Sequence, residues 1–131
     1  MKNLVILSVV VLGASFLTSC LTTQEPTCNS SSYAPIVSAI GPKTISVNQP
    51  AVFAIGYTLG SDCGKLSDVV AAANGNTVQV GITSVYNGCA CNATTAVSQT
   101  TYQFQALKAG TYYIQFLTGN NTFITDTVVV N

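Results

Sequence analysis

The side chains from Tyr33 onward alternate between apolar and polar with a period of two residues, and this pattern limits the fold more than any other feature of the chain. Successive side chains of a strand point to opposite faces, so the alternation predicts strands with one buried face rather than helices, whose period is about 3.6 residues. The residues expected on buried faces are Phe53, Ile55 and Tyr57, then Val78, Val80 and Ile82, then Tyr102, Phe104 and Ala106, and then Tyr112, Ile114 and Phe116. We therefore expect an all-β domain.

Short turn sequences separate the predicted strands. The clearest is Asn74-Gly75-Asn76, which is typical of a tight hairpin between two alternating segments. Lys108-Ala109-Gly110 and Gly119-Asn120-Asn121 mark two further turns. About seven strands, with turns at intervals of about eight to twelve residues, favour an antiparallel β-sandwich, and a small barrel is the alternative.

The final strand, residues 123–130, does not alternate as simply as the others. Its two predicted faces hold Phe123, Thr125 and Val129 on one side and Ile124, Val128 and Val130 on the other. A β-bulge adds one residue to a strand and changes which face the following side chains occupy. We therefore expect a bulge near Thr125-Asp126.

Charged side chains are scarce, and this restricts the possible partners and chemistries. The 131 residues include four lysines, four acidic residues and no His, Arg or Trp. No basic patch is available to follow a phosphate backbone, so nucleic acid is not an expected partner. The lack of His excludes Ser-His-Asp and Cys-His nucleophile systems and removes the commonest metal ligand. We expect neither enzyme activity nor a bound cofactor or metal.

Four cysteines beyond residue 20, namely Cys28, Cys63, Cys89 and Cys91, form an even set that is typical of disulfides in a small exported domain. A bond between Cys89 and Cys91 would close a very small and strained ring. The two other pairings, which join Cys89 and Cys91 to Cys28 and Cys63 in either order, both stay open. A loop of the length between Cys63 and the close pair would contribute on the order of 3 kcal/mol in the chain-entropy estimate.

Thiol chemistry is the alternative use of Cys89 and Cys91. A zinc site needs four soft ligands at suitable spacing, and these thiols match no zinc pattern well. A redox pair needs a helix N-terminus or a nearby cation, and the sequence shows no helical segment here. A redox or metal-handling protein is thus the alternative to a protein with structural disulfides.

The loops that carry the cysteines also carry the candidates for a binding surface. Asp62 and Lys65 belong to the one cluster of charged residues in the chain, and Tyr86 and Asn87 lie just before the close cysteine pair. Disulfides would hold these loops rigid and would so reduce the ordering cost of binding. We expect the loop end that contains these four residues to contact a partner.

Carboxylates offer three further patterns. Calcium could bind Asp62 and Asp68, although no EF-hand-like loop surrounds them. A glycoside hydrolase would need two facing carboxylates, drawn from Asp62, Asp68 and Asp126. Asp126-Thr127-Val128 fits a short pattern that some bacteria use for O-glycosylation.

Tyrosines suggest a carbohydrate-binding module as another alternative. Tyr33, Tyr86 and Tyr113 are expected to point outward, where an aromatic ring can stack against a sugar. Tyr86 is the residue expected to do so, because it adjoins Asn87 and the cysteine pair.

The first twenty residues carry an export signal. Lys2 supplies a positive start, and residues 4–12 form an apolar run that is too short to span a bilayer permanently. Leu17-Thr18-Ser19-Cys20 resembles the lipobox of bacterial lipoproteins, in which an aliphatic residue and two small residues precede a cysteine. The resemblance implies cleavage after residue 19 and lipid on the sulfur and the amine of Cys20, which together make an anchor of several acyl chains.

This resemblance divides the chain into three parts: a signal peptide at 1–19, a lipidated tether at 20–32 and a folded domain at 33–131. It implies anchoring in the bacterial cell envelope. Leu21 rather than Asp follows the cysteine, which favours the outer membrane.

A second resemblance concerns residues 109–116, which read A-G-T-Y-Y-I-Q-F. This segment is similar to a strand entry of immunoglobulin-like domains, where a Gly-x-Tyr at a corner brings the tyrosine hydroxyl onto the backbone. The resemblance implies an immunoglobulin-like sandwich with Gly110 in the turn and Tyr112 as the corner tyrosine. The chain departs from antibody domains because it has no Trp, and because Ile55 and Ile114 stand where inter-sheet cysteines would be expected.

These features together predict a lipid-anchored envelope protein with one disulfide-stabilised sandwich. Its expected role is that of a non-enzymatic binding or structural module for another envelope protein or a glycan.

Overall fold

The computed structural model of the protein describes residues 27–131. The predicted signal peptide, the predicted lipidation site Cys20 and the tether up to residue 26 lie outside this range. The tether was expected to reach residue 32, but the first strand begins at Asn29, so its last four residues belong to a sheet. In residues 27–131 no helix has the length and apolarity needed to cross a membrane.

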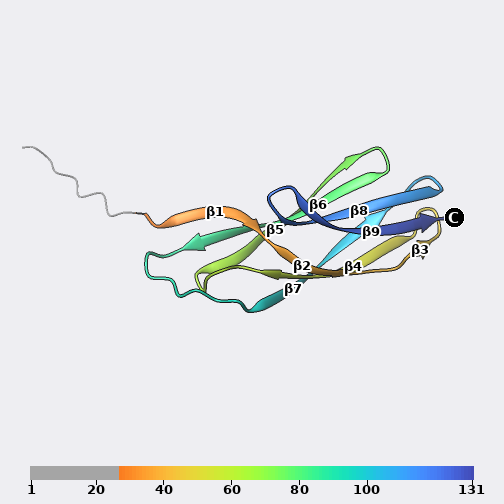
Figure 1. Cartoon of the computed structure of the whole chain (residues 1–131). Coiled ribbons are helices and arrows are strands. Elements are labelled where there is room, and N and C mark those ends of the chain that lie inside the picture. The colour runs from red at the N-terminus through yellow and green to blue at the C-terminus, as the bar shows by residue number, and fades with distance from the viewer. Residues whose placement is uncertain (1–26) are drawn as a thin grey trace, which may run out of the picture.

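Nine strands form two sheets that pack as the layers of a sandwich (Figure 1). The larger sheet has six strands in the order β1-β6-β8-β9-β3, with β5 on the other edge of β6, and the smaller sheet has the order β2-β4-β7. The strands are β1 (Asn29–Ala34), β2 (Ile36–Ile40), β3 (Thr44–Ile45), β4 (Pro50–Thr58), β5 (Gly64–Asn74), β6 (Thr77–Asn87), β7 (Val97–Gln105), β8 (Gly110–Gly119) and β9 (Thr122–Val130). The predicted β-sandwich is confirmed, with nine strands instead of about seven.

Two of the strand pairs are parallel, whereas an antiparallel sandwich was expected. β3 runs parallel to β9, and β6 runs parallel to β8. Neither pair joins strands that are consecutive in the chain. Between β6 and β8 the chain passes through β7 in the smaller sheet, and β3 and β9 are separated by five strands. A strand that arrives after such a crossover can pair in either direction, so local turn signals could not predict these two pairings.

Strand β6 carries partners on both of its edges. β5 follows one edge along almost the whole strand, from Asn74↔Thr77 to Gly64↔Tyr86. The other edge is shared, because β8 pairs with residues 77–80 and β1 pairs with residues 82–87. β1 and β8 therefore lie end to end along one edge of β6.

The predicted alternation matches the burial in the structure. Phe53 of the smaller sheet and Phe116 of the larger sheet are fully buried, and their ring centroids lie 5.3 Å apart. Ile55 and Ile114 are buried as well. The buried hydrophobic residues that the sequence predicted are Phe53, Ile55, Tyr57, Val78, Val80, Ile82, Phe104, Ala106, Ile114 and Phe116.

Tyr112 lies at the rim of this core and makes the hydrogen bond expected of a corner tyrosine. Its hydroxyl donates to the backbone carbonyl of Lys108 at 3.0 Å. Gly110, two residues earlier, has a φ of 153°, which a residue with a side chain rarely adopts. The two residues thus fix the turn between β7 and β8.

The bulge predicted near Thr125-Asp126 is wrong. β9 pairs with β8 in unbroken register through this region, and the shift in register lies at Leu117/Gly119 instead. Regular alternation turns Asp126 inward, where it is only 5% exposed. Lys43 forms an ion pair with Asp126 across 83 residues of sequence. A buried carboxylate is tolerated here because a cation neutralises it.

Loss of the Lys43 ammonium should therefore destabilise the fold. We expect Lys43→Met to lower the free energy of unfolding by about 1–3 kcal/mol, because it leaves a buried acceptor without its partner. Urea unfolding at neutral pH measures this change. Lys108→Met is the matched control, since that side chain is exposed and its backbone carbonyl is unaffected. Equal stability of the two variants would contradict a stabilising role for the ion pair.

Candidate functional site

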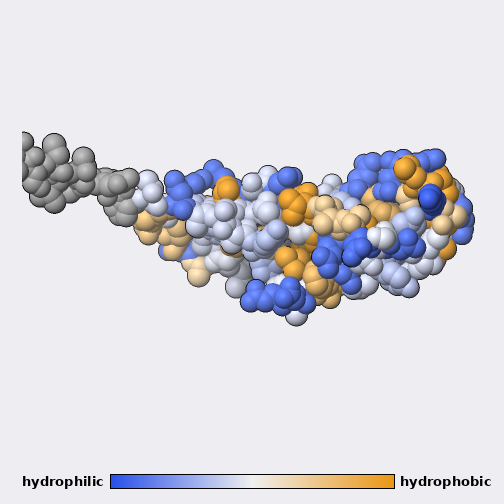
Figure 2. Space-filling model, turned by 90° about the horizontal axis from the view of Figure 1, so that it is seen from above, coloured by the Kyte–Doolittle hydropathy of each residue, from blue (hydrophilic) through white to orange (hydrophobic). Residues whose placement is uncertain are grey.

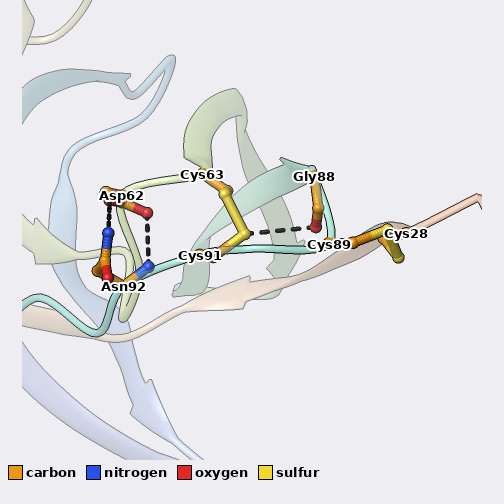
Figure 3. The surroundings of a disulfide bond; sticks show 7 residues. All are labelled: Cys28, Asp62, Cys63, Gly88, Cys89, Cys91 and Asn92. Atoms are coloured by element: carbon orange, nitrogen blue, oxygen red, sulfur yellow. Dashed lines mark hydrogen bonds between the residues drawn. A yellow bond between two sulfur atoms is a disulfide. The ribbon is translucent and has the colours of Figure 1, made fainter.

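The four cysteines form two disulfides at one end of the sandwich (Figure 3). Cys28 binds Cys89 with a Cα–Cα distance of 5.0 Å, and Cys63 binds Cys91 with a Cα–Cα distance of 5.5 Å. The structure thus selects one of the two pairings that the sequence left open. We call this region, residues 59–64 and 86–94 together with Cys28, the disulfide end.

Each disulfide closes the open end of a strand pair. Cys28 directly precedes β1, whose first residue, Asn29, pairs with Asn87 at the end of β6. Cys63 directly precedes β5, whose first residue, Gly64, pairs with Tyr86. Both cross-links therefore stand where the two ladders of β6 would otherwise fray.

Hydrogen bonds join the same two loops beside the disulfides. The Asp62 carboxylate accepts bonds from the backbone N–H and the side-chain amide of Asn92, both at 2.9 Å (Figure 3). The backbone N–H of Asp62 in turn donates to the carbonyl of Asn92. A bridge between Ser61 and Ala93 continues this pairing. The loops are thus held together by covalent and non-covalent contacts.

Asn92 also affects the ionisation of Asp62. Its side-chain amide, and then its backbone N–H, hold the pKa of the Asp62 carboxyl below its usual value, because both stabilise the charged form. Both carboxylate oxygens accept a bond from Asn92. Asp62 is therefore hydrogen-bonded to a partner within the disulfide end.

Tyr86 packs within the disulfide end and is not presented as a surface ring. The sequence predicted it as an outward ring for a sugar, but its hydroxyl donates to the backbone carbonyl of Leu59 and its side chain is half-buried. Its ring also lies against Gly64, where a Cβ atom would come within 2.8 Å of it. Lys65 and Asn87 are exposed beside it, so the structure does bring the four predicted residues to one end.

One group in the described chain has metal-ligand atoms close together. Ligand atoms of Asp62, Cys63 and Cys91 lie within 4.8 Å of one another. The two sulfurs are bonded to each other, whereas the thiolate is the form that binds metal. Asp68, the other carboxylate of the calcium hypothesis, lies on β5 and accepts from the N–H of Val69. This arrangement fits a cross-link better than a metal centre.

Comparison with known proteins assigns the fold to a family. A family model described as the ORF11 beta-sandwich domain matches residues 53–130, which is more than half of the chain. The chain belongs to this family. The ORF11 beta-sandwich match contains Cys63, Cys89 and Cys91 but not Cys28, so one disulfide lies inside the matched region and the other ties it to β1. No curated protein and no solved structure matches the chain significantly.

The two disulfides should contribute unequally to stability. The Cys63–Cys91 bond spans 28 residues and the Cys28–Cys89 bond spans 61 residues. The chain-entropy estimate gives roughly 3.5 and roughly 4.3 kcal/mol, respectively. We expect a Cys28→Ala/Cys89→Ala variant to unfold at a lower urea concentration than a Cys63→Ala/Cys91→Ala variant. The reverse order would show that loop length does not set the stabilisation.

Acid should weaken the disulfide end through Asp62. A carboxyl with a lowered folded-state pKa stabilises the fold above its unfolded pKa of about 3.9, and this stabilisation is lost as the pH falls through the folded pKa. We expect the native chain to lose more stability between about pH 6 and about pH 2.5 than Asp62→Asn does. Urea unfolding at both pH values gives the comparison. Identical acid sensitivity of the two proteins would contradict this linkage.

Proposed function

We propose that the protein is a lipid-anchored component of the bacterial cell envelope whose sandwich is a non-enzymatic binding or structural module. The sequence Leu17-Thr18-Ser19-Cys20 supports the anchor through its resemblance to a lipobox. Two disulfides support an oxidising, extracytoplasmic location, because reducing compartments keep thiols free. Leu21 after the cysteine favours the outer membrane. In this proposal the partner is another envelope protein or a glycan, and nucleic acid is not one.

The observation that carries the proposal is the position of the Cys28–Cys89 bond. Cys28 follows the predicted lipidation site by eight residues. Eight residues reach at most about 29 Å when fully extended. A lipid on Cys20 would therefore keep the disulfide end close to the membrane, while the C-terminus lies at the opposite end of the elongated domain (Figure 1). The sheet faces and the far end would then be the surfaces open to a partner.

The carboxylates of the described chain support a non-enzymatic role. Asp62 accepts bonds from Asn92, Asp68 accepts from the N–H of Val69, and Asp126 is paired with Lys43. Each aspartate thus has a local partner.

The resemblance to immunoglobulin-like domains gains support from Tyr112. The bond from its hydroxyl to the Lys108 carbonyl is the contact expected of a corner tyrosine. One departure is that β8, which carries Tyr112, lies beside a parallel strand, β6. Immunoglobulin sheets are antiparallel, so in this proposal the chain is a variant of that sandwich.

The alternative, a redox or metal-handling protein, would need Cys89 and Cys91 as thiols. In the structure they belong to two separate disulfides, so the pair would first have to be reduced or exchanged. Their oxidation state in the cell envelope therefore distinguishes the two functions.

Intact mass spectrometry tests the proposal. The protein is extracted from its native membrane and alkylated without reduction. We expect a chain that begins at Cys20, carries the mass of the lipid and has no alkyl groups. A Cys20→Ser variant is the control and should lack the lipid. A native chain without lipid would overturn the anchor, and two alkyl groups on Cys89 and Cys91 would favour thiol chemistry.

A further inference from the structure

The outer face of the larger sheet is hollowed where β1 and β8 meet. The last pair of β1 is Ala34↔Ile82, and the last pair of β8 is Val80↔Phe116. Gly81 lies between them and has no partner on this edge of β6, although Val70 of β5 pairs with it on the other edge. The ladder on this edge of β6 is thus interrupted at Gly81, between its pairing with β8 and its pairing with β1.

Tyr33 lies at this joint and rests on Gly81. A Cβ atom on Gly81 would come within 3.1 Å of the Tyr33 ring, so a side chain at this position would push the ring outward by a few tenths of an ångström. The ring is also near Val70, whose Cγ2 is 3.6 Å from the same Cβ position. Tyr33 is nevertheless 60% exposed. One part of the ring is therefore supported by the sheet and the rest is presented to solvent.

Three hollows border on Tyr33. One, with a volume of about 390 Å³, lies within the size range of small-ligand sites, and its other lining includes Val70, Gln79, Leu117, Asn121 and Phe123. A second, of about 210 Å³, extends past Pro35 toward Gly119 and Asn120. A third, of about 420 Å³, is lined by Ser31, Ser32, Ser67 and Thr83. Tyr33 borders all three hollows, and we call them together the trough.

The side chains that line the trough carry no charge. Apolar groups form one part, and hydroxyls and amides form the rest. Gln79 donates from its Nε2 to Oε1 of Gln115 at 3.2 Å, which fixes both amides and leaves the Gln79 carbonyl as an acceptor. Figure 2 shows hydrophobic and hydrophilic residues interspersed along the face seen from above Figure 1.

We propose that the trough around Tyr33 binds a neutral oligosaccharide. A sugar ring offers an apolar C–H face, which packs on an aromatic ring, and hydroxyls, which both donate to and accept from amides. Asp68 pairs with Thr83, as Tyr33 does from the other side, and it directly follows Ser67, which lines the trough, so a negative charge beside the trough disfavours acidic glycans. The inference rests on the proposed binding function and deepens it by naming the ligand class.

The location also fits that function better than the disulfide end does. The disulfide end would face the membrane, and its tyrosine, Tyr86, donates its hydroxyl to Leu59. Tyr33 lies on a sheet face, where a glycan chain can approach from the side. The carbohydrate hypothesis drawn from the sequence is thus moved from Tyr86 to Tyr33.

Binding of the full-length, membrane-extracted protein to immobilised glycans tests the proposal. The panel contains neutral glucan and N-acetylglucosamine oligomers, sulfated and sialylated glycans, and extended apolar peptides. We expect retention on at least one neutral oligomer and a loss of at least ten-fold in affinity for Tyr33→Ala. Tyr113→Ala is the matched control, because Tyr113 is also an exposed tyrosine on this sheet, at 46%, but does not line the trough.

Two further variants keep the test decisive if Tyr33→Ala unfolds. Tyr33→Phe preserves the ring and should retain binding within about three-fold, whereas Gln79→Ala removes a trough amide and should weaken binding about five-fold. Thermal melting of each variant verifies the fold. The inference would be overturned if the protein retained no neutral glycan, or if it retained only charged glycans or peptides. Equal binding by Tyr33→Ala and Tyr113→Ala would overturn it as well. The intact mass of the same preparation separates this failure from failure of the anchor.

Discussion

The pairing of β6 on both edges is the constraint on which the rest of the structure depends. β5 occupies one edge, and β8 and β1 divide the other. The inward side chains of β6, Val78, Val80 and Ile82, are all buried in the core. Both disulfides lie just beyond its C-terminal end, and the trough lies at its middle. The cross-linked end and the open face are therefore two consequences of how one strand is shared.

The sequence predicted the properties that depend on neighbouring residues. Alternation identified which side chains of β4, β6, β7 and β8 face inward, because the two faces of a strand are set by the backbone alone. The turn at Gly75 was also predicted, because Asn74-Gly75-Asn76 is a typical hairpin sequence. In the structure Gly75 has a φ of 59°, a value that favours glycine. The order of the strands was not predicted, because β1 and β8 reach β6 from distant parts of the chain.

Asp126 also shows that contacts between distant parts of the chain could not be predicted from the sequence. Simple alternation places this acid in the core, whereas the sequence interpretation expected a bulge near Thr125-Asp126. The structure keeps the alternation and supplies Lys43 from 83 residues away. Tyr86 and Tyr33 differ for a related reason. Both were expected to point outward, but only Tyr33 does so, because the Tyr86 hydroxyl donates to the carbonyl of Leu59, a residue far from it in the sequence.

The Cys28–Cys89 bond also determines how the domain bears tension. A pull on the chain ahead of Cys28 would otherwise load the β1–β6 ladder one pair at a time, beginning at Asn29↔Asn87, and strands separated in this way resist little force. The disulfide passes the load directly to Cys89, and from there through Cys91 to Cys63. Force applied at the N-terminal side thus travels through covalent bonds into two loops of the larger sheet. The ladder of β1 is bypassed, so the domain can be held by its N-terminal segment without being unzipped from it.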